Sequence, residues 1–404
     1  MTGGTARAAP SPRRWLPKAL VLLGAILPFT PVDSAWGQEA TEGVYARPFI
    51  GRGDATAIGG YLEANTNYFV EDGISEGFSF EFRRFNLFFF SPISQRIQFL
   101  SELEFEHGTE EIALETALID FRINPWVTFR GGIILPPLGY FNQNHDSPRW
   151  EFVDRPLVST GIIPSTLSEV GGGVVGLVSL GGVRLTYDAY LTNGLGDGIL
   201  DNDLGRTDIS SGRSEEAFAE DSNGSPAFSA RVAASNPLGR LGFSYYGGTY
   251  NRTSIEGDAV DVERRLDLFA VDVGASLGPV ELVGEAALAS IDVPSALTEV
   301  FGDRQWGFHV DAVWPIWSPP IAGYQNAVLN LSARVEHVDY NAGTFSSTGG
   351  NIGDHVTGVV GGLSFRPSPG TVFRFNYRRQ WHRDFAGNPI IPGAGLQLGF
   401  ATYF

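Results

Sequence analysis

The sequence contains no cysteine, a single methionine and a single lysine, Lys18. No disulfide framework, thiolate nucleophile or cysteine metal site can therefore form. Long apolar runs are scarce as well: residues 19–29 form a run of about 11 residues, short of the roughly 20 that a membrane-spanning helix needs. No later segment reaches that length without a charge, so helical membrane spans are excluded.

The amino terminus has the layout of an export signal. Four basic residues precede the apolar run: Arg7, Arg13, Arg14 and Lys18. After the run, Ala35-Trp36-Gly37 places small residues at the −3 and −1 positions of a cleavage site. We therefore predict a signal peptide over residues 1–37, cut before Gln38. The remaining chain would have no lysine, and its 24 arginines would face 44 aspartates and glutamates, a net charge of −20 that argues against nucleic acid as a partner.

Composition and periodicity together indicate an all-β protein. A hydrophobic content of 43% with a mean hydropathy of −0.02 is too polar for a bundle of membrane helices and too aromatic for a disordered chain. In the segment 372–377, Phe373, Phe375 and Tyr377 share one face while Arg374 and Asn376 share the other, which is the alternation of a strand. Sixteen such strands are predicted to begin near residues 57, 77, 96, 111, 126, 171, 182, 226, 240, 265, 279, 303, 325, 355, 371 and 393.

The connections between these strands are predicted to alternate strictly between short turns and longer polar loops. The predicted short turns lie at Ser91-Pro92, Asn124-Pro125, Gly181-Gly182, Asn236-Pro237, Gly278-Pro279, Ser318-Pro319-Pro320 and residues 367–370. A soluble β-sandwich has no reason to sort its loops in this way, whereas periplasmic turns and extracellular loops of a bacterial barrel do so. The last strand also alternates up to a terminal aromatic, Phe404, and barrel closure requires that it pair with the first strand.

These features predict a transmembrane antiparallel up-and-down β-barrel of about 16 strands over residues 56–404, in the bacterial outer membrane. Residues 38–55 are expected to form a periplasmic N-terminal segment. A barrel of this size encloses water rather than side chains alone, so we expect passive diffusion of small hydrophilic solutes. Lipid and lipopolysaccharide are the expected surroundings.

One family resemblance rests on three segments. The runs Leu135 to Asn142 (LPPLGYFN) and Glu151 to Val158 (EFVDRPLV), with Phe82-Arg83-Arg84-Phe85 upstream, resemble the phosphate-selective porin O and P family. The resemblance implies a homotrimeric sixteen-stranded channel with anion preference, in which the third extracellular loop, here about residues 136–171, folds into the pore. On that basis the constriction residues would be Tyr140, Asn142, Arg149, Asp154 and Arg155. Phosphate-selective members use a lysine cluster beside a lumen arginine ladder, and this chain has no lysine after residue 37.

Side-chain parity gives the expected pore lining. If the aromatic faces meet lipid, the lumen receives Arg122, Arg130, Arg184, Arg231, Arg334, Arg374 and Arg378. Arg83 and Arg84 join them where the alternation of the second strand slips, which predicts a bulge. Such a ladder suits phosphate or carboxylate oxygens. The same parity turns acids inward, however: Glu102, Glu104, Asp120, Asp188, Asp272, Glu281, Glu285, Asp311 and Glu336. A braced wall in a weakly selective general or sugar pore is therefore an open alternative.

The remaining features of the sequence do not predict a catalytic reaction. The six histidines are scattered and match no zinc or nucleophile motif, so the sequence predicts no enzyme, no cofactor and no metal site. His309 and Asp311 share a face, which keeps an enzymatic or adhesive barrel as a third reading. The acidic loop at residues 193–225 either binds divalent cations at the lipopolysaccharide surface or is simply solvated. Interfacial aromatics are expected at Trp126, Trp306, Trp314, Trp317, Tyr324, Trp381 and Phe404.

Overall fold

The computed structural model describes residues 43–50, 55–75, 77–321, 323–324, 326–384 and 388–404. The predicted signal peptide and the cleavage site before Gln38 lie outside the described residues. Among the described residues, no helix has the length and the apolar character needed to cross a membrane.

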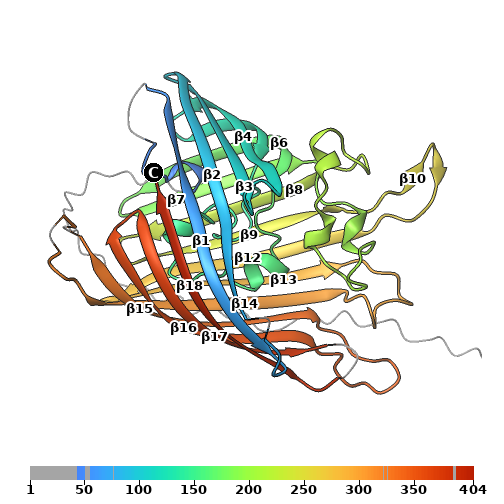
Figure 1. Ribbon diagram of the computed structural model, residues 1–404. Helices are drawn as coiled ribbons and strands as arrows, with labels where there is room; N and C mark the ends of the chain where they lie inside the picture. Colours follow the sequence, from blue (N-terminus) through green and yellow to red (C-terminus); the bar gives the residue numbers. More distant parts are fainter. Residues whose placement is uncertain (1–42, 51–54, 76, 322, 325, 385–387) are drawn as a thin grey trace, which may run out of the picture. The chain divides into compact units, whose positions relative to one another are not determined.

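Sixteen antiparallel strands form one closed barrel, in which each strand pairs with its neighbours in the sequence and β1 pairs with β18 (Figure 1). The barrel strands are β1 (Ala57–Glu71), β2 (Phe78–Ser94), β3 (Ile97–Glu106), β4 (Glu111–Asn124), β5 (Val127–Ile134), β6 (Glu169–Leu180), β7 (Val183–Thr192), β8 (Ala227–Asn236), β9 (Gly239–Thr249), β12 (Arg265–Leu277), β13 (Val280–Ile291), β14 (Arg304–Trp317), β15 (Val328–Asn341), β16 (Asp354–Ser368), β17 (Thr371–Arg383) and β18 (Ile391–Tyr403). The predicted fold class is confirmed, and every predicted strand begins within three residues of an observed one.

The remaining elements are short. They are the helix α1 (Val158–Gly161), the 3-10 turns η1 (Gly43–Tyr45), η2 (Ser147–Arg149), η3 (Asp197–Ile199), η4 (Ser210–Gly212) and η5 (Glu215–Phe218), and a small hairpin of β10 (Ser254–Ile255) and β11 (Asp258–Ala259). All of them lie in connections between barrel strands or, for η1, before β1. The strands therefore carry the architecture and the connections carry the irregular structure.

The barrel closes through its two terminal strands, as the sequence predicts. Tyr61 of β1 lies opposite Tyr403 of β18, and the pairing continues to Glu71 opposite Gly393. Beyond the strand, Phe404 and Gly60 exchange both backbone hydrogen bonds at 3.0 and 3.2 Å. Because every strand thus has two neighbours, the sheet leaves no unpaired edge.

The connections differ by rim, although not as strictly as predicted. On one rim six of the seven connections have two residues, and the seventh, residues 318–327, has ten. On the other rim they range from four residues (107–110) to 34 residues (135–168 and 193–226). The predicted turn at Ser91-Pro92 is wrong: β2 continues to Ser94, and the chain reverses at residues 95–96. Pro92 fits within the strand because the register shifts beside it, between Pro92 and Ser94, where the lack of an N–H is tolerated.

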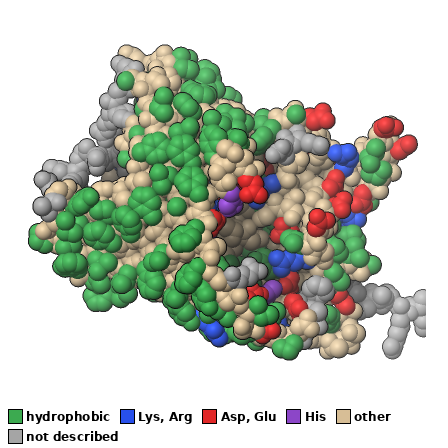
Figure 2. Space-filling view, viewed as in Figure 1, with side chains coloured by type: hydrophobic (Ala, Val, Ile, Leu, Met, Phe, Trp, Pro, Cys, Tyr) green, Lys and Arg blue, Asp and Glu red, His purple; other side chains and the backbone are tan. Residues whose placement is uncertain are grey.

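The outer face of the barrel is apolar. Phe373, Phe375 and Tyr377 are 43–49% exposed, whereas Arg374 and Asn376 between them are buried. The same alternation covers the strand surface with hydrophobic side chains, while charged side chains gather at the loop end around a hollow (Figure 2). All seven expected interfacial aromatics are exposed: Trp126, Trp306, Trp314, Trp317, Tyr324, Trp381 and Phe404.

The buried apolar core lies inside the barrel. One cluster joins α1 and the 193–226 connection, through residues such as Ile162, Ile199 and Ile209, to the inner faces of β12 and β13 at Leu268 and Ala289. A second cluster joins the segment before β1 to the inner faces of β2 to β5 and β7. Part of the inner wall is therefore covered by folded connections, and the acidic connection 193–226 is partly a packed element rather than only a solvated loop.

Candidate functional site

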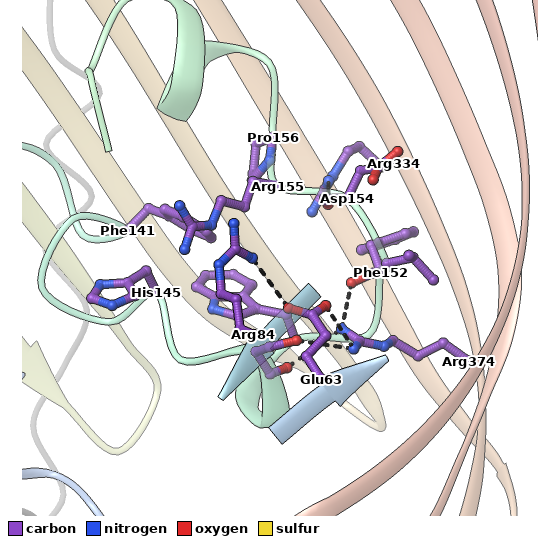
Figure 3. Close-up of a pocket in the computed structure, with 13 residues that line it drawn as sticks. Glu63, Arg84, Phe141, His145, Phe152, Asp154, Arg155, Pro156, Arg334 and Arg374 are labelled. Atoms are coloured by element: carbon purple, nitrogen blue, oxygen red, sulfur yellow. Dashed lines mark hydrogen bonds and ion pairs between the residues drawn. The ribbon is translucent and has the colours of Figure 1, made fainter. Parts of the chain in front are cut away.

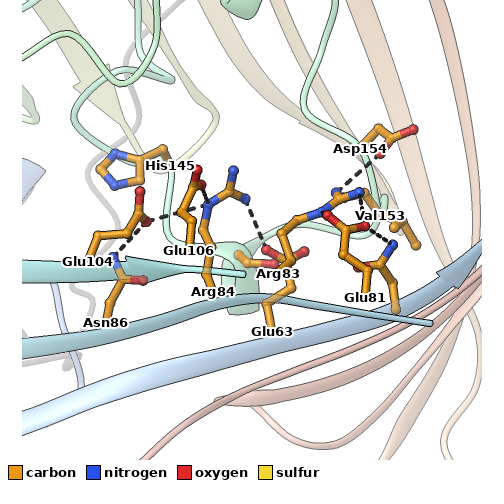
Figure 4. A network of polar contacts seen from close by, with 12 residues as sticks. Glu63, Glu81, Arg83, Arg84, Asn86, Glu104, Glu106, His145, Val153 and Asp154 are labelled. Carbon is orange, nitrogen blue, oxygen red and sulfur yellow. Dashed lines mark hydrogen bonds and ion pairs between the residues drawn. The ribbon is translucent and has the colours of Figure 1, made fainter. Parts of the chain in front are cut away.

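Arg83 and Arg84 lie at a bulge in β2. In the β1–β2 pair, Arg84 is opposite Glu63 and Phe82 is opposite Ala64, so Arg83 is an extra residue. A bulge of this kind re-aims side chains, and here both guanidinium groups reach carboxylates of the inner wall. Arg84 contacts Glu63, Glu104 and Glu106 at 3.1, 3.4 and 2.7 Å. Arg83 contacts Glu81 at 3.0 Å and the 135–168 segment at Asp154 (Figure 4). The predicted bulge is confirmed.

The inward arginines of the wall are paired with acids. The distances are 2.8 Å for Arg130–Asp120, 2.8 Å for Arg231–Asp272, 2.7 Å for Arg334–Asp311, 3.2 Å for Arg374–Glu63 and 2.6 Å for Arg378–Asp154. Most of these pairs are bidentate or carry further hydrogen bonds, which is the geometry in which arginine holds a carboxylate firmly. Each pair is close to neutral, so over most of its length the row of arginines stabilises the inner wall and adds little net charge.

Two predicted arginines lie apart from these pairs. Arg122 is exposed near the end of β4, beside the short turn at residues 125–126. Arg184 is half-buried near the start of β7, on the same rim. Among the predicted inward acids, Glu281 is likewise exposed at the start of β13. Arg122 and Glu281 therefore lie outside the buried ion pairs of the described part of the wall.

The segment 135–168 contacts inward-facing side chains on distant strands. Glu285 of β13 accepts hydrogen bonds from the Tyr140 N–H at 2.6 Å and from the Ser159 hydroxyl at 2.8 Å. Two further strands bind the segment: Asn376 of β17 accepts a hydrogen bond from the Val153 N–H at 2.8 Å, and Glu336 of β15 accepts one from the Leu157 N–H at 3.0 Å.

Guanidinium groups hold the same segment by its backbone carbonyls. Arg374 donates to the Phe152 carbonyl at 2.7 Å, and Arg334 donates to the Asp154 carbonyl at 2.9 Å. These arginines come from β17 and β15, so their contacts add to those of Asn376 and Glu336. The segment is tied to the inner wall by its backbone as well as by its side chains.

The five side chains expected at the constriction have different roles. Asn142 is fully buried and closes the neck of the segment, since its side chain bonds to Pro136, Leu167 and the Leu167 N–H. Tyr140 stacks beneath the Arg240 guanidinium at 3.4 Å. Arg149 binds Asn144 at 2.7 Å and Tyr403 at 3.2 Å. These three residues shape the segment.

Asp154 and Arg155 form its tip. Asp154 accepts hydrogen bonds from Arg83, Arg378 and Gln397, so its charge is compensated from three strands. Arg155, by contrast, makes no ion pair with any described residue, and its Nη2 nitrogen is buried without a hydrogen-bond partner. Arg155 is therefore an expected constriction residue whose charge is not held in an ion pair within the described part of the chain.

A narrow recess with a volume of about 10 Å³, partly open to solvent, lies beside this tip. Four arginines line it, namely Arg84, Arg155, Arg334 and Arg374, together with Glu63 and aromatic side chains of the segment. Figure 3 shows these side chains converging on one space from the segment and from the nearby strands β2, β1, β17 and β15. The Arg155 Nη2 and the Arg374 Nε are buried without a hydrogen-bond partner among the described residues. The lining arginines outnumber the two lining acids, Glu63 and Asp154, so the recess has a surplus of positive groups.

Two titratable groups of the segment have strongly shifted pKa values. Burial alone would lower the pKa of His145, but the facing carboxylates of Glu115 and Glu102 raise it to about 10. Burial would raise the pKa of Asp146, but the guanidinium groups of Arg47 and Arg149 hold it below its usual range. Both groups are therefore charged near neutral pH and lock the segment electrostatically.

Residues 43–50 also contact the inner wall. Arg47 is 5% exposed and bridges Glu102 of β3, at 3.1 Å, to Asp146 of the 135–168 segment, at 2.9 Å. The Tyr45 hydroxyl donates to Asp120 at 2.9 Å. The described part of the segment predicted to be periplasmic is thus packed against the barrel interior, and it connects the wall to the 135–168 segment.

Several residues of the site could not be identified from strand alternation alone. Glu115 has the parity of the lipid face in β4, yet it is 3% exposed and turned inward by a bulge. Glu63 and Arg240 lie on the inward faces of strands β1 and β9, where the alternation places them, but parity alone does not single them out. Arg47 precedes the first strand, so no strand pattern covers it. In a single sequence, the strand alternation is the signal that predicts which residues face inward, and this signal fails at bulges.

The structure offers no support for acid–base work by His309 and Asp311. The Asp311 carboxylate is held by Arg334 through two hydrogen bonds of 2.7 Å, and both ring nitrogens of His309 lack a partner among the described residues. The two side chains are not hydrogen-bonded to each other in the described part of the chain. A general base needs such a positioned partner.

Comparisons with known proteins show the fold. No family model matches the chain. One curated relative, an uncharacterized protein of Aquifex aeolicus, is 33% identical over 166 residues, and the match spans only 37% of this chain and 37% of that protein.

Solved structures match over far more of the chain. An anion-selective porin from Comamonas acidovorans has a TM-score of 0.54 at 11% identity, over 87% of this chain and 99% of that one. OmpF of Salmonella typhi, in complex with daunomycin, has a TM-score of 0.54 at 11% identity, over 87% and 98%. OmpT of Vibrio cholerae in its trimer form has a TM-score of 0.52 at 10% identity, over 87% and 100%. With its closed barrel and apolar outer face, the chain has the fold of the outer-membrane porins and is a protein of the bacterial outer membrane.

Proposed function

We propose that this chain is a porin: a passive diffusion channel for small hydrophilic solutes, with a preference for anions and with its constriction formed by the segment 135–168. The observation that carries the proposal is the recess beside Arg155, where three arginines of the barrel strands and Arg155 of the segment line one polar space. No catalytic chemistry is needed for this role. The signal peptide over residues 1–37 and cleavage before Gln38 belong to the same proposal.

The segment 135–168 is suited to narrow a channel because it is rigidly held. Its backbone and side chains bond to β13, β15 and β17, which lie on different parts of the barrel wall. An irregular segment inside a barrel is tolerated where its polar backbone groups find partners in this way. Its tip leaves Arg155 beside the recess, where a passing solute would meet the guanidinium group.

The anion preference rests on the uncompensated charge of that tip. Because Arg130, Arg231, Arg334 and their partners form near-neutral pairs, they contribute little net field. Arg155 has no such partner, and an unpaired guanidinium lowers the free energy of an anion near it. Ion selectivity in channels arises from rings or clusters of charge at the narrowest point.

The test is the reversal potential of the purified protein in planar lipid bilayers under a salt gradient. We expect the sign of an anion-preferring pore. A cation-selective reversal potential would refute the anion preference while leaving the channel itself intact. The absence of any conductance, together with absent swelling of liposomes in small sugars, would refute the channel and favour an adhesive or enzymatic barrel.

A general or sugar-conducting pore is the second candidate, favoured by the paired charges of the wall. Opposed acids and arginines, as in the Arg374–Glu63 and Arg378–Asp154 pairs, produce a transverse field without a strong ion preference. Block of the current by oligosaccharides but not by phosphate would support this candidate.

Assembly as a homotrimer is part of the proposal. It is supported by the exposed apolar side chains that surround the barrel and by the trimer form described for Vibrio cholerae OmpT. Lipid and lipopolysaccharide would cover the rest of that surface. Cross-linking of the native protein in membranes tests the stoichiometry, and a monomeric pattern would count against it.

A further inference from the structure

Three side chains of metal-ligand type meet where the segment 135–168 contacts β3 and β4. His145 Nε2 lies 3.1 Å from a Glu115 oxygen and 3.8 Å from a Glu102 oxygen. One ligand atom from each of the three residues lies within 4.8 Å of the others, and all three residues are buried. In the described part of the chain this is the group of His, Cys, Asp or Glu side chains that meets the spacing of a shared metal ion.

The position of Glu115 is a consequence of strand geometry. In the β3–β4 pair, Glu102 lies opposite Thr116 and Leu103 lies opposite Leu114, so Glu115 is an extra residue at a bulge. Without the bulge, the alternation of β4 would direct Glu115 toward the opposite face from Thr116. The bulge instead brings a second carboxylate to the inner wall beside Glu102.

The three ligand atoms are oriented by outer hydrogen bonds. His145 Nδ1 donates to the Asn142 carbonyl at 2.9 Å, which leaves Nε2 facing the carboxylates. The Thr166 hydroxyl donates to Glu115 at 2.5 Å, and the Asn86 amide donates to Glu102 at 2.9 Å. Metal-binding histidines characteristically donate the second ring N–H to a carbonyl or carboxylate in this manner.

An independent observation is a buried hydroxyl without a partner. Tyr61 of β1 is 0% exposed, and its hydroxyl has no hydrogen-bond partner among the described residues. Tyr61 lies opposite Asn86 of β2, and the Asn86 amide donates to both Glu102 and Glu104. An unmade buried hydrogen bond is costly in free energy, and a cation with its bound water would supply the missing partner.

The charges of the buried carboxylates also favour a bound cation at this position. Glu102, Glu104 and Glu115 are three buried carboxylates, and their ion pairs in the described part of the chain are with Arg47, Arg84 and His145. Like charges that lie close together in a buried site repel one another. A divalent ion that replaces the proton on His145 Nε2 would add one positive charge at the centre of this repulsion.

We propose that Glu102, Glu115 and His145 bind a divalent first-row transition-metal ion, of which Zn²⁺ is the representative, and that the ion clips the segment 135–168 to the β3–β4 wall. One imidazole nitrogen and two carboxylate oxygens suit zinc better than calcium or magnesium, which prefer oxygen alone. Ligand atoms of a tetrahedral zinc site lie roughly 3.4 Å apart. The 3.1 and 3.8 Å separations in the structure are close to that value.

The experiment measures Zn²⁺ binding to the chelator-treated, folded protein in detergent by titration calorimetry and elemental analysis. We expect one zinc ion per chain, and a loss of affinity of about 100-fold or more in His145→Gln and Glu115→Gln, since each removes one ligand while keeping its volume. The matched control is His337→Ala. The rings of His337 and His355 lie 5.5 Å apart on the outer face and form the competing surface site.

The outcomes separate clearly. Zinc binding that survives His337→Ala but not the two ligand variants supports the site. No binding to the wild-type chain, or binding lost only in His337→Ala, overturns it. If either ligand variant fails to fold, the wild-type chain loaded with Co²⁺ still decides: an intense visible spectrum of a four-coordinate ion supports the site, and a weak six-coordinate spectrum overturns it. Neither result depends on whether the protein conducts ions.

Discussion

Replacing Arg155 by alanine tests the electrostatic basis of the proposed selectivity. Arg155 lines the recess and makes no ion pair with a described residue, so its removal subtracts a charge without breaking an ion pair. Removal of a paired arginine would instead leave its acid without a partner. A unit charge about 4 Å from a passing ion contributes ~1 kcal/mol in water and ~4 kcal/mol at an effective dielectric constant near 20. Because the recess is partly open to solvent, we use the lower figure, which corresponds to roughly a fivefold change for each ion. The anion becomes less favoured and the cation more favoured, so the anion-to-cation permeability ratio should fall by up to about 30-fold.

The assay is the reversal potential in planar bilayers under a salt gradient, at low and at high ionic strength. Near 0.1 M salt the Debye length is about 10 Å, and at 1 M it is about 3 Å, so the effect should shrink at high salt. Arg155→Lys keeps the charge and should retain the wild-type ratio. Arg252→Ala is the matched control, because Arg252 is exposed in the connection after β9 and makes no ion pair with a described residue. An unchanged ratio in Arg155→Ala, or an equal change in Arg252→Ala, would refute the reasoning.

Three further changes test the barrel itself. Gly132→Ala should lower thermal stability markedly, because Gly132 has φ +125° and a Cβ there would lie 2.1 Å from the Ala117 carbonyl oxygen; heat-modifiability on gels measures it. Arg334→Met should destabilise the fold by about 3–5 kcal/mol, since it leaves Asp311 buried and unpaired, and the double variant with Asp311→Asn should recover most of that loss in denaturant unfolding. Removal of Phe404 should reduce assembly in cells more than stability in detergent, since its backbone closes the barrel at Gly60; the yield of heat-modifiable protein in membranes checks it.

Each of these three has a result that contradicts it. If Gly132→Ala unfolds at the same temperature as the wild-type chain, the strand accommodates a side chain at that position without loss of stability. A double variant no more stable than Arg334→Met alone would show that the buried acid is not the source of the loss. Equal yields with and without Phe404 would show that closure does not depend on the terminal residue.

The strand pattern could be predicted from the sequence because it is a local property. Alternation in a segment such as residues 372–377 requires only that one face meets lipid and the other meets the interior, and this requirement repeats in every strand. The pairing of β18 with β1 follows from the same logic, since a barrel cannot leave an edge. The turn at Ser91-Pro92 was wrong because proline next to a bulge is compatible with a strand.

The site could be predicted only in part because its contacts are long-range. The alternation places Arg374 inward, but it does not reveal that Arg374 holds Glu63 and the Phe152 carbonyl, which lie hundreds of residues away. Glu115 was missed because a bulge of one residue reverses the parity. Arg47 was missed because it belongs to no strand, and its role depends on a segment that the sequence places outside the barrel.

The inner wall is divided into two sectors, and this division restricts the anion preference to one side. The faces of β12 and β13 are apolar at Leu268 and Ala289 and are covered by packed connections. The faces of β1, β17 and β18 are polar, with Asn65, Asn376 and Gln397 buried there. Solutes are therefore expected to pass along the second sector, beside the tip of the segment 135–168.

Phosphate should change selectivity in this sector without being held tightly. A tight site would need several accessible donors, yet Arg374 is already bound to Glu63 and the Phe152 carbonyl. Its Nε and the Nη2 of Arg155 lack a partner among the described residues, but both atoms are buried. A phosphate ion would also have to approach the Glu63 carboxylate that lines the same space. We therefore expect phosphate to carry current in bilayer recordings and to leave the chloride current unblocked at millimolar concentrations. Saturating block by phosphate at low concentration would show that the arginine pairs open to bind it.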